Sequence, residues 1–552
     1  MAERALRWYG WGYADTTYSL EHRPGAWPYL QERLGLPDDE HTPPVDPATI
    51  TLRPSRAPEV ALAALRLALG EDGVSTADEV RLAHSLGKSY LDAVALRRGQ
   101  VPNPTDAVVF PASEEAVQQV LALAAAHGLA VAPFGGGTSV VGGVEPRGAK
   151  PTVTLSLARL NQVLAVDTFS YTVTAQAGVL GPDLERALND RDLTVAHSPQ
   201  SFEFSTLGGW IAARGAGQTS TKYGKIEDKV ISLRMVTPAG VVETPRVPAS
   251  ATGPSLLQML VGSEGVYGVI TQATLRLAPL PRVTRGRAFM FKDFASGQAA
   301  VRALLQTGFR PAVVRLSDEA ETRTLYALRE TAHGWRTLRQ QLGLGALSRA
   351  GQSFENGAVL ILRFEGDDFR TEVEEGQGRS VCRALGGFDL GSGLAHGWYR
   401  DRYHTPYLRE VLFDRGVLLD VVETATEWDN VAALHARVQA ALTQAIVATG
   451  SKALVMCHLS HAYTDGASLY FTFLAHANHR HEPEQWQVIK DAATDCIVRS
   501  GGTLSHHHGV GHDSARWMPA ETGAAGMLAL RAVKAALDPE GVMNPGKLLG
   551  TE

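Results

Sequence analysis

Cysteine is scarce in this sequence of 552 residues. Its three cysteines, Cys382, Cys457 and Cys496, are too few and too widely spaced for a disulfide framework or a cysteine metal cluster, and they indicate a reducing compartment. Long apolar runs are also missing. No segment reaches the roughly 18 uninterrupted apolar residues of a membrane-spanning helix, and the first residues lack the apolar core of a secretory signal. We therefore expect a cytoplasmic protein, with peripheral contact to a membrane left open.

Positive charge is not in excess either. The formal net charge is -6, which argues against the basic surface typical of nucleic-acid binding. The hydrophobic share of 44% and the charged share of 20% are those of an ordinary globular protein. A chain of this length is expected to hold about two to four domains and to bury an ample core.

Strands and helices alternate from residue 102 onward. The segment 105–113 is strand-like, the amphipathic pattern of 114–128 predicts a helix, and 129–134 reads as a second strand, which together make a βαβ unit. Prolines near residue 280 mark a boundary. We predict an α+β chain of four parts: a helical extension, two domains, and a C-terminal segment that packs back on the first domain. Their bounds are 1–101, 102–281, 282–503 and 504–552.

The first domain contains a strand that runs into a glycine-rich loop. Residues 130–146 read AVAPFGGGTSVVGGVEP. Consecutive glycines mark a tight turn or a close approach of the backbone to a ligand, and successive backbone N–H groups can form an anion-binding nest. The loop has neither the G-x-G-x-x-G pattern nor the lysine of a P-loop. It is therefore a candidate phosphate site of another kind, and a hairpin without a ligand is the alternative.

Two further segments of the same domain are rich in glycine. In 197–224, Ser205 and Thr206 are candidate N-caps of a short helix. In 262–270, the backbone N–H groups of Glu264 and Gly265 can face the same ligand. Several such segments in one domain suit a long ligand with a diphosphate and a flat ring.

The motifs PFGGGTS, QSFEFSTLGGW and EGVYGVI, in this order, resemble the FAD-binding domain of vanillyl-alcohol-oxidase-type flavoproteins. Three others are more specific: WYGWGY at 8–13, YTDGASLYFTF at 463–473 and GGTLSHHHGVG at 501–511 resemble the alkyldihydroxyacetonephosphate synthase family. The likeness spans nearly the whole chain. It implies a two-subdomain FAD-binding domain over 102–281 and a cap domain with an antiparallel sheet over 282–503.

This resemblance implies a redox-neutral reaction in which a fatty alcohol replaces the acyl chain of acyl-dihydroxyacetone phosphate. The partners would be that lipid precursor and a long-chain alcohol, with no nucleic acid. The family implies a homodimer and peripheral membrane association. FAD would be bound without a covalent link, because Thr138 stands about where some superfamily members attach the flavin to a histidine.

The resemblance places four flavin-binding segments on this chain. Gln-Ser-Phe at 200–202 departs from the more usual Asp-Ser-Leu, and Ala213 and Gly215 depart from the usual residues beside Arg214, which puts side-chain contacts there in doubt. The cofactor-binding residues implied are Pro133, Phe134, Gly135, Gly136, Gly137, Thr138, Ser139, Gln200, Ser201, Phe202, Glu203, Phe204, Ser205, Thr206, Ala213, Arg214, Gly215, Ala216, Glu264, Gly265, Val266, Tyr267, Gly268, Val269 and Ile270.

The resemblance also implies catalytic residues, and no metal. Tyr470 falls at the family's general acid or base, and its phenol would need cationic neighbours to lower its pKa from about 10. The cations would come from His506, His507 and His508, which match an essential histidine cluster. Because neighbouring residues on a strand alternate between faces, we expect at least one of these histidines to be structural.

Two arginines complete the set that the resemblance implies. Arg315 is tied to activity, and Arg409 is expected to bind the substrate phosphate, for which a guanidinium offers paired donors. Taken alone, the residues also allow plainer interpretations. Tyr470 lies among apolar residues, as a core aromatic would, and the two arginines have carboxylates close by in the sequence, Asp318 and Glu410.

A flavin-dependent D-2-hydroxyacid dehydrogenase, of the D-lactate or glycolate type, is the main alternative. The tail VMNPGKLL resembles those enzymes. Many of them carry a metal-linked H-x-x-D-G-x-x-H pattern, but Ala462 and Leu469 stand at its histidine positions here and His507 stands at a later glutamate. A version of this pattern shifted by one residue, with His461 as a ligand, is left open. A non-catalytic flavin-binding or lipid-binding protein is a third hypothesis.

Overall fold

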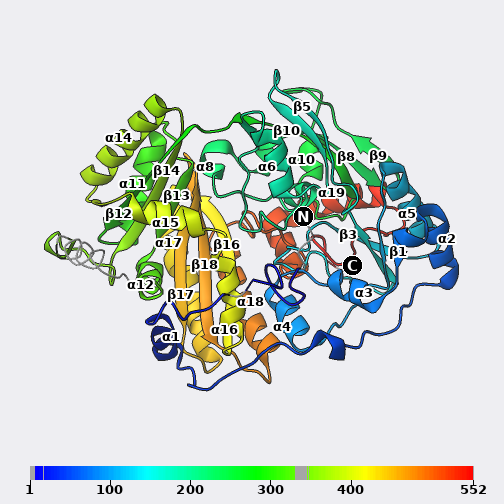
Figure 1. Ribbon diagram of the computed structural model, residues 1–552, viewed down its shortest axis with the longest axis horizontal. Coiled ribbons are helices and arrows are strands. Elements are labelled where there is room, and N and C mark those ends of the chain that lie inside the picture. Colours follow the sequence, from blue (N-terminus) through cyan, green and yellow to red (C-terminus); the bar gives the residue numbers. More distant parts are fainter. Residues whose placement is uncertain (1–5, 17, 330–344, 346, 551–552) are drawn as a thin grey trace.

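A computed structural model describes residues 6–16, 18–329, 345 and 347–550 (Figure 1). The glycine-rich segments lie in one part, on the right of Figure 1, and a large antiparallel sheet forms the other part, on the left. The expected α+β class with two sheets on the flavin side and an antiparallel cap sheet is confirmed.

The first sheet has the strand order β1-β2-β4-β3. Its strands are β1 (Val74–Ser75), β2 (Ala107–Val109), β4 (Thr152–Ser156) and β3 (Ala130–Phe134). Helix α5 (Glu114–Ala126) connects β2 to β3, and both strands pair in parallel with β4, which lies between them. The predicted βαβ unit is therefore correct, and β3 ends where the first glycine loop begins.

The second sheet is antiparallel, with the order β5-β6-β10-β8-β9. Its strands β8 and β9 form a hairpin. Short helices and a two-stranded pair connect these strands. The elements are β5 (Val163–Asp167), β6 (Thr172–Gln176), α6 (Gly181–Asn189), β7 (Leu193–Thr194), α7 (Leu207–Ala212), α8 (Ser220–Tyr223), α9 (Ile226–Lys229), β8 (Val230–Thr237), β9 (Gly240–Glu243), α10 (Leu256–Leu260), β10 (Val269–Arg276) and β11 (Ala278–Pro279).

The cap sheet has seven strands in the order β15-β12-β14-β13-β17-β18-β16. Every pairing in it is antiparallel. Its strands are β12 (Val283–Phe291), β13 (Val313–Ser317), β14 (Ala358–Gly366), β15 (Phe388–Gly391), β16 (Val417–Glu427), β17 (Leu454–Ala462) and β18 (Gly466–His476).

Four long helices cover one face of the cap sheet: α11 (Phe294–Gln306), α14 (Asp368–Ala384), α17 (Trp428–Ala448) and α18 (Glu482–Arg499). Among the described helices, α17 has the length and composition that a membrane span would need. Its buried residues recur every three or four positions, from Val431 through Leu434 to Val438, and pack in the cap core. The opposite face of the sheet is left for the site.

The N-terminal segment runs along both parts, as the blue trace in Figure 1 shows. Helix α1 (Ala26–Leu34) packs against β17 and β18, whereas α2 (Glu59–Leu69) packs into the core of the first part. Several shorter helices lie near the site or contact this segment. They are α3 (Asp78–Ala83), α4 (Tyr90–Arg97), α12 (Glu319–Ala327), α15 (Gly393–Asp401) and α16 (Leu408–Phe413).

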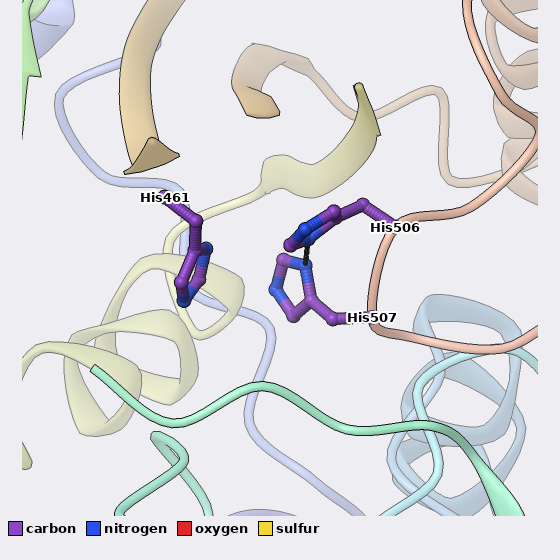
Figure 2. A group of neighbouring side chains, drawn as sticks. All are labelled: His461, His506 and His507. Atoms are coloured by element: carbon purple, nitrogen blue, oxygen red, sulfur yellow. Dashed lines mark hydrogen bonds between the residues drawn. The ribbon is translucent and has the colours of Figure 1, made fainter. Parts of the chain in front are cut away.

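The C-terminal segment returns to the first part. It contains α19 (Met518–Leu537), and its end pairs with β3: the N–H of Val131 donates to Val542 O at 2.8 Å, and the N–H of Asn544 donates to Val131 O at 2.8 Å. Before α19 lies the histidine loop, residues 505–511, which has no regular secondary structure. Figure 2 shows two of its rings facing His461, at the end of β17.

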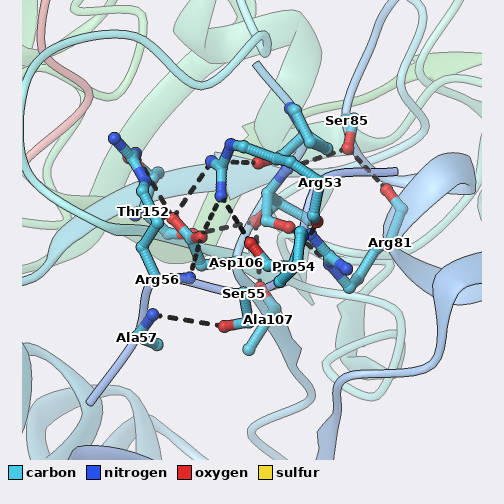
Figure 3. A network of polar contacts seen from close by, with 12 residues as sticks. Arg53, Pro54, Ser55, Arg56, Ala57, Arg81, Ser85, Asp106, Ala107 and Thr152 are labelled. Carbon is cyan, nitrogen blue, oxygen red and sulfur yellow. Dashed lines mark hydrogen bonds and ion pairs between the residues drawn. The ribbon is translucent and has the colours of Figure 1, made fainter. Parts of the chain in front are cut away.

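Asp106 fixes the N-terminal segment to the first sheet (Figure 3). Its side chain is fully buried and accepts hydrogen bonds from Arg53 Nη1 at 2.6 Å, from the Arg56 N–H at 2.7 Å and from the Thr152 N–H at 2.8 Å. Burial opposes the charge, but these donors, Arg53 first, hold the pKa of Asp106 below its usual value.

Replacing Asp106 with Ala should lower the free energy of unfolding of this part by about 1–3 kcal/mol, because the partly buried Arg53 guanidinium and the N–H groups of Arg56 and Thr152 lose their acceptor. Since the pKa of Asp106 is lower in the folded state, its contribution is present above the unfolded pKa and is lost as the pH falls through the folded one. Chemical denaturation at several pH values measures both effects. Asp72→Ala, which removes the exposed ion pair with Arg159, is the control and should change stability by about 1 kcal/mol or less.

Candidate active site

A cavity of about 890 Å³ lies between the glycine-rich segments and the open face of the cap sheet. Its wall on one side includes all of residues 133–139. On the other side it includes alternate residues of β16, β17 and β18, together with one side of α12. The cavity thus joins the predicted cofactor segments to the predicted catalytic residues.

The first and second glycine segments are packed directly on each other. A Cβ atom at Gly136 would lie 1.7 Å from Phe204 O, and one at Gly135 would lie 2.3 Å from Thr206 Oγ1. No side chain fits at either position, so the bare backbone is required for this approach. The Ser139 Oγ accepts from the N–H of Gly143 at 2.9 Å and so holds the loop's own turn.

The second segment is divided between the cavity and the surrounding contacts. Gln200, Ser201, Ser205 and Thr206 line the cavity. Thr206 caps α7 by accepting from the Gly209 N–H, as predicted. The residues between them turn away. Phe202 stacks on Trp210 and Tyr403, Glu203 accepts from Tyr407, and Phe204 packs on Trp11 and Tyr13.

The small residues of the third segment face the cavity, whereas its arginine does not. Ala213, Gly215 and Ala216 line the cavity. Arg214, with φ of 50°, directs its guanidinium to the carbonyls of Val261 and Gln258, at 3.0 and 2.6 Å. Two backbone carbonyls at the end of α10 thus take the donors of Arg214, which agrees with the doubt that its neighbours raised about side-chain contacts to the cofactor here.

The fourth segment joins the cavity to the histidine loop. Glu264, Gly265, Gly268 and Ile270 line the cavity, whereas Val266, Tyr267 and Val269 are core residues. The N–H of Glu264 donates to Ala212 O at 3.0 Å. It is therefore not free for a ligand, contrary to the expectation from the sequence. The buried Glu264 carboxylate accepts from the N–H groups of Val510 and Gly511, at 2.7 and 2.6 Å. Burial raises its pKa to about 7.

The open face of the cap sheet changes from apolar to polar along its strands. Residues directly opposite one another form rows across β16, β18 and β17, and those of one row share a face. The rows are Leu419, Leu474 and Leu454; then Val421, Thr472 and Met456; then Glu423, Tyr470 and His458. The polar row lies at the end nearest the histidine loop, whose backbone binds Glu423.

Tyr470 lies in this polar row and faces the cavity. It is not a core aromatic, because its ring is stacked on His458, with centroids 4.9 Å apart, and borders open space. Burial raises the pKa of its phenol, and the carboxylates of Asp420 and Glu423 raise it further. The expectation of a lowered pKa is therefore wrong for this structure. The phenol is therefore neutral at neutral pH and can donate a proton or a hydrogen bond to the cavity.

The three consecutive histidines have different surroundings. His507 and His508 line the cavity, and His506 does not. The His506 ring contacts Tyr463 Oη at 2.6 Å through Nε2 and His507 at 3.0 Å through Nδ1. One histidine is thus structural, as predicted, although they lie on a bent loop and not on a strand.

These rings are not the cations that the sequence led us to expect. Burial lowers the pKa of His508 to about 3 and holds that of His506 well below the usual range, with His461 and His507 acting in the same direction on His506. Both rings are therefore neutral at neutral pH, and His508, which lines the cavity, offers it a hydrogen-bond acceptor and not positive charge.

His461, His506 and His507 place ring nitrogens within 4.8 Å of one another, close enough to hold a metal ion (Figure 2). The hydrogen bonds of His461 and His506 favour a cluster without a metal, because their ring nitrogens already have protein partners. His461 uses Nε2 to donate to Gly217 O at 3.1 Å and Nδ1 toward Ser460 Oγ at 3.0 Å. His506 also has a partner on each nitrogen. The absence of a metal stays a prediction.

Both arginines line the cavity, and each has a carboxylate partner. Arg315 pairs with Glu321 at 2.9 Å and not with Asp318, which caps α12 instead. Arg409 pairs with Glu410 at 3.3 Å, as its sequence neighbourhood suggested, and donates to Lys88 O at 2.9 Å.

Several residues of the site escaped the sequence interpretation. His458 and Glu321 line the cavity and bind each other at 2.9 Å, and Glu423 holds the histidine loop. The pattern C-H-L-S-H on β17 contained a signal for His458, because alternate positions of a strand share a face. Nothing in the sequence spacing pointed to Glu423, which lies more than 80 positions before the histidines.

Comparisons with known proteins agree with this geometry. Residues 105–245 match the FAD binding domain family, and residues 280–548 match the family of FAD linked oxidases, C-terminal domain. The chain is 34% identical to alkyldihydroxyacetonephosphate synthase of Trypanosoma brucei brucei, over 88% of this chain and 80% of that one. It is 32% identical to the Dictyostelium discoideum protein of the same name, over 99% and 94%.

A solved structure of alkyldihydroxyacetonephosphate synthase superposes on this chain with a TM-score of 0.84, at 28% identity and over 98% of both chains. The match therefore includes the cap sheet, the glycine segments and the histidine loop. The chain is an FAD-binding flavoprotein and belongs to the alkyldihydroxyacetonephosphate synthase family.

Proposed function

We propose that this protein exchanges the acyl chain of acyl-dihydroxyacetone phosphate for a long-chain alcohol, in a redox-neutral reaction that uses FAD. The observation that carries the proposal is the shape of the cavity. A cradle of glycine backbone forms one wall, and a sheet face that passes from leucines to Tyr470 and His458 forms the other. Such a wall suits a substrate with an apolar chain and a polar head.

The apolar end is suited to an acyl or alkyl chain. Besides Leu419 and Leu474 of the sheet, leucines from the N-terminal segment, α12 and α16 line this cavity. They are Leu20, Leu30, Leu325, Leu328, Leu408 and Leu412. Because chains gain about 0.8 kcal/mol for each buried CH₂ group, such a lining favours long-chain substrates.

The cradle fits FAD, since the bare backbone at 135–136 can offer N–H groups to a diphosphate. Residues 133–139, Gln200, Ser201, Thr206, Ala213 and Gly265 would hold it. When bound, the flavin supplies the electron-pair chemistry that lets one chain leave the substrate carbon before the other joins it.

The chain's own residues bind the head group and move protons. Arg409 and Arg315 attract the phosphate and carbonyl oxygens. Tyr470, a neutral phenol, donates to the oxygen where charge develops. The rings of His507 and His508, beside Tyr470, are positioned to take the proton that the alcohol loses.

The dehydrogenase alternative lacks support in the site. Ala462 and Leu469, which stand at the two histidine positions of the metal-linked pattern, are buried in the core on the helix-covered side of the sheet. His461 faces the cavity, but its nitrogens have partners in Gly217 and Ser460. A ligand set of that kind is not assembled among the described residues.

Three proposals concern the protein's surroundings. The resemblance supports a homodimer and peripheral association with a membrane, whereas the proposal of a cytoplasmic protein comes from the sequence itself. The small number of cysteines agrees with the last of these. Light scattering after size-exclusion chromatography and flotation with phospholipid vesicles are the measurements for the first two.

FAD is expected to be released by acid. Thr138 occupies the cradle and offers only a hydroxyl group there, which cannot form the histidine linkage of some flavoproteins. Acid precipitation of the purified yellow protein should leave the chromophore in the supernatant. A yellow pellet would contradict the prediction.

Arg409→Ala should weaken binding of acyl-dihydroxyacetone phosphate by about 1.5–3 kcal/mol, which corresponds to a KM about 10 to 150 times higher. The reason is the loss of charge-assisted hydrogen bonds to the phosphate. Arg409→Lys keeps the charge, so its KM should lie between those of the wild type and Arg409→Ala. Flavin content, measured by absorbance, should stay unchanged. A loss of FAD, or an unchanged KM, would assign Arg409 to structure.

Tyr470→Phe removes one hydroxyl and keeps the ring stacked on His458. We expect a folded, FAD-loaded variant whose alkyl exchange is slower by about 10²–10⁴-fold, the usual contribution of a positioned acid or base. The same assay, with acyl-dihydroxyacetone phosphate and a long-chain alcohol, should show a similar loss for His507→Ala and His508→Ala. Parallel assays with D-lactate and glycolate test the alternative. Full alkyl exchange by Tyr470→Phe would refute the assigned role.

A further inference from the structure

The histidine loop is oriented by one buried carboxylate. Glu423 accepts from the backbone N–H groups of His506, His507 and His508, at 2.8, 3.1 and 3.0 Å. It also accepts from Ser505 Oγ at 2.7 Å. Consecutive N–H groups that converge on one anion form a nest. Because the loop has no helix or strand hydrogen bonds of its own, the path of its backbone at the three histidines depends on this carboxylate, as its end at Val510 and Gly511 depends on Glu264.

Glu423 also sets where the loop lies relative to Tyr470. The two residues are directly opposite each other on β16 and β18, and Glu423 is only 6% exposed. With the loop bound to Glu423, the rings of His507 and His508 lie 6.1 and 5.6 Å from the ring of Tyr470. The carboxylate thus ties the histidines to the strand pair that carries the phenol.

The carboxylate has a side-chain contact in addition to the backbone ones. Its Oε2 lies 3.3 Å from His507 Nδ1, and among the described residues its ion pairs are with histidines alone. Burial alone would raise the pKa of Glu423, but His507 first, and then His508 and His506, hold it well below its usual range. An Nδ1–H on His507 faces both Glu423 Oε2 and His506 Nδ1, which lies 3.0 Å away, and two acceptors on this side of the ring leave Nε2 as its proton acceptor.

We propose that Glu423 is a positioning residue of the alkyl-exchange reaction: it orients the histidine loop beside Tyr470 and holds His507 in the tautomer whose Nε2 accepts the proton of the alcohol. The proposal rests on the proposed function. The proton moves from the alcohol oxygen to Nε2 as that oxygen bonds to the substrate carbon, and Glu423 keeps its charge throughout.

Groups from three strands and the loop face His507, and Glu423 is the anion among them. Tyr470 is kept neutral by the raised pKa of its phenol, and burial lowers the pKa of His458 and that of His461. Removal of the Glu423 charge therefore takes away the anion in contact with this ring. The titratable groups are Glu423 on β16, His458 and His461 on β17, Tyr470 on β18, and His506 and His508 in the loop.

Glu423→Gln keeps the volume of the side chain, removes the charge and replaces one acceptor oxygen with a donor. In the FAD-loaded protein we expect kcat for alkyl exchange to fall by about 10²-fold or more, with FAD content and the KM for acyl-dihydroxyacetone phosphate unchanged. The acid limb of the kcat/KM profile should move to lower pH. Glu427→Gln, the same change at the exposed end of the same strand, should keep the wild-type rate and profile.

A second measurement needs no turnover. Diethyl pyrocarbonate modifies unprotonated imidazole, so the pH dependence of modification at His507, read by mass spectrometry of the FAD-loaded protein, reports its protonation. Modification should extend to lower pH in Glu423→Gln than in the wild type. Glu423→Asp keeps the charge, so its modification profile should be closer to that of the wild type. It is also the variant to measure if Glu423→Gln fails to load FAD.

An unchanged rate in Glu423→Gln overturns the proposal. So does a slower rate with an unmoved acid limb, or a modification profile that is the same in the wild type and the Gln variant. A wild-type protein without alkyl exchange refutes the proposed function instead, and the modification profiles still decide the role of Glu423.

Discussion

Two buried carboxylates, one from each side of the cavity, hold the histidine loop. Glu264 of the flavin side accepts from the N–H groups of Val510 and Gly511, and Glu423 of the cap accepts from three consecutive N–H groups. A buried carboxylate without donors is costly, so both sides must be in place for either carboxylate to be satisfied. The position of His507 and His508 relative to the flavin cradle and Tyr470 depends on this shared loop.

The cap sheet supplies the other constraint. Its helix-covered face is mostly apolar, because α17 and its neighbours pack on it, and its buried Asp420 is bound by Trp486 and Lys490 of α18. Its open face varies along each strand. On β17 the open face reads Met456, His458 and Ser460. A period of two thus lets one strand stabilise the core and build a graded substrate wall with alternate residues.

The N-terminal segment belongs to the same site. A Cβ at Gly10 would lie 2.4 Å from the Glu410 carboxyl group, and one at Gly12 would lie 2.0 Å from the Tyr407 ring, so the motif WYGWGY is pressed against α16. Trp11 lines the cavity, with its ring 6.0 Å from the guanidinium of Arg409. The aromatic motif therefore completes the wall beside the proposed phosphate-binding residue.

The sequence by itself determined much of this. Glycines at 135–137 and 208, where a Cβ would collide, required a close backbone approach, and the periodic pattern of α5 predicted that helix. The motifs around Tyr470 and the histidines gave the family. What only the tertiary structure decided depends on residues far apart in the chain. Arg214 turns toward α10, the partner of Arg315 is Glu321, and Glu423 binds a loop more than 80 residues away. Burial sets the pKa values of Tyr470 and His508 against the sequence expectation, because desolvation arises from packing and not from the order of residues.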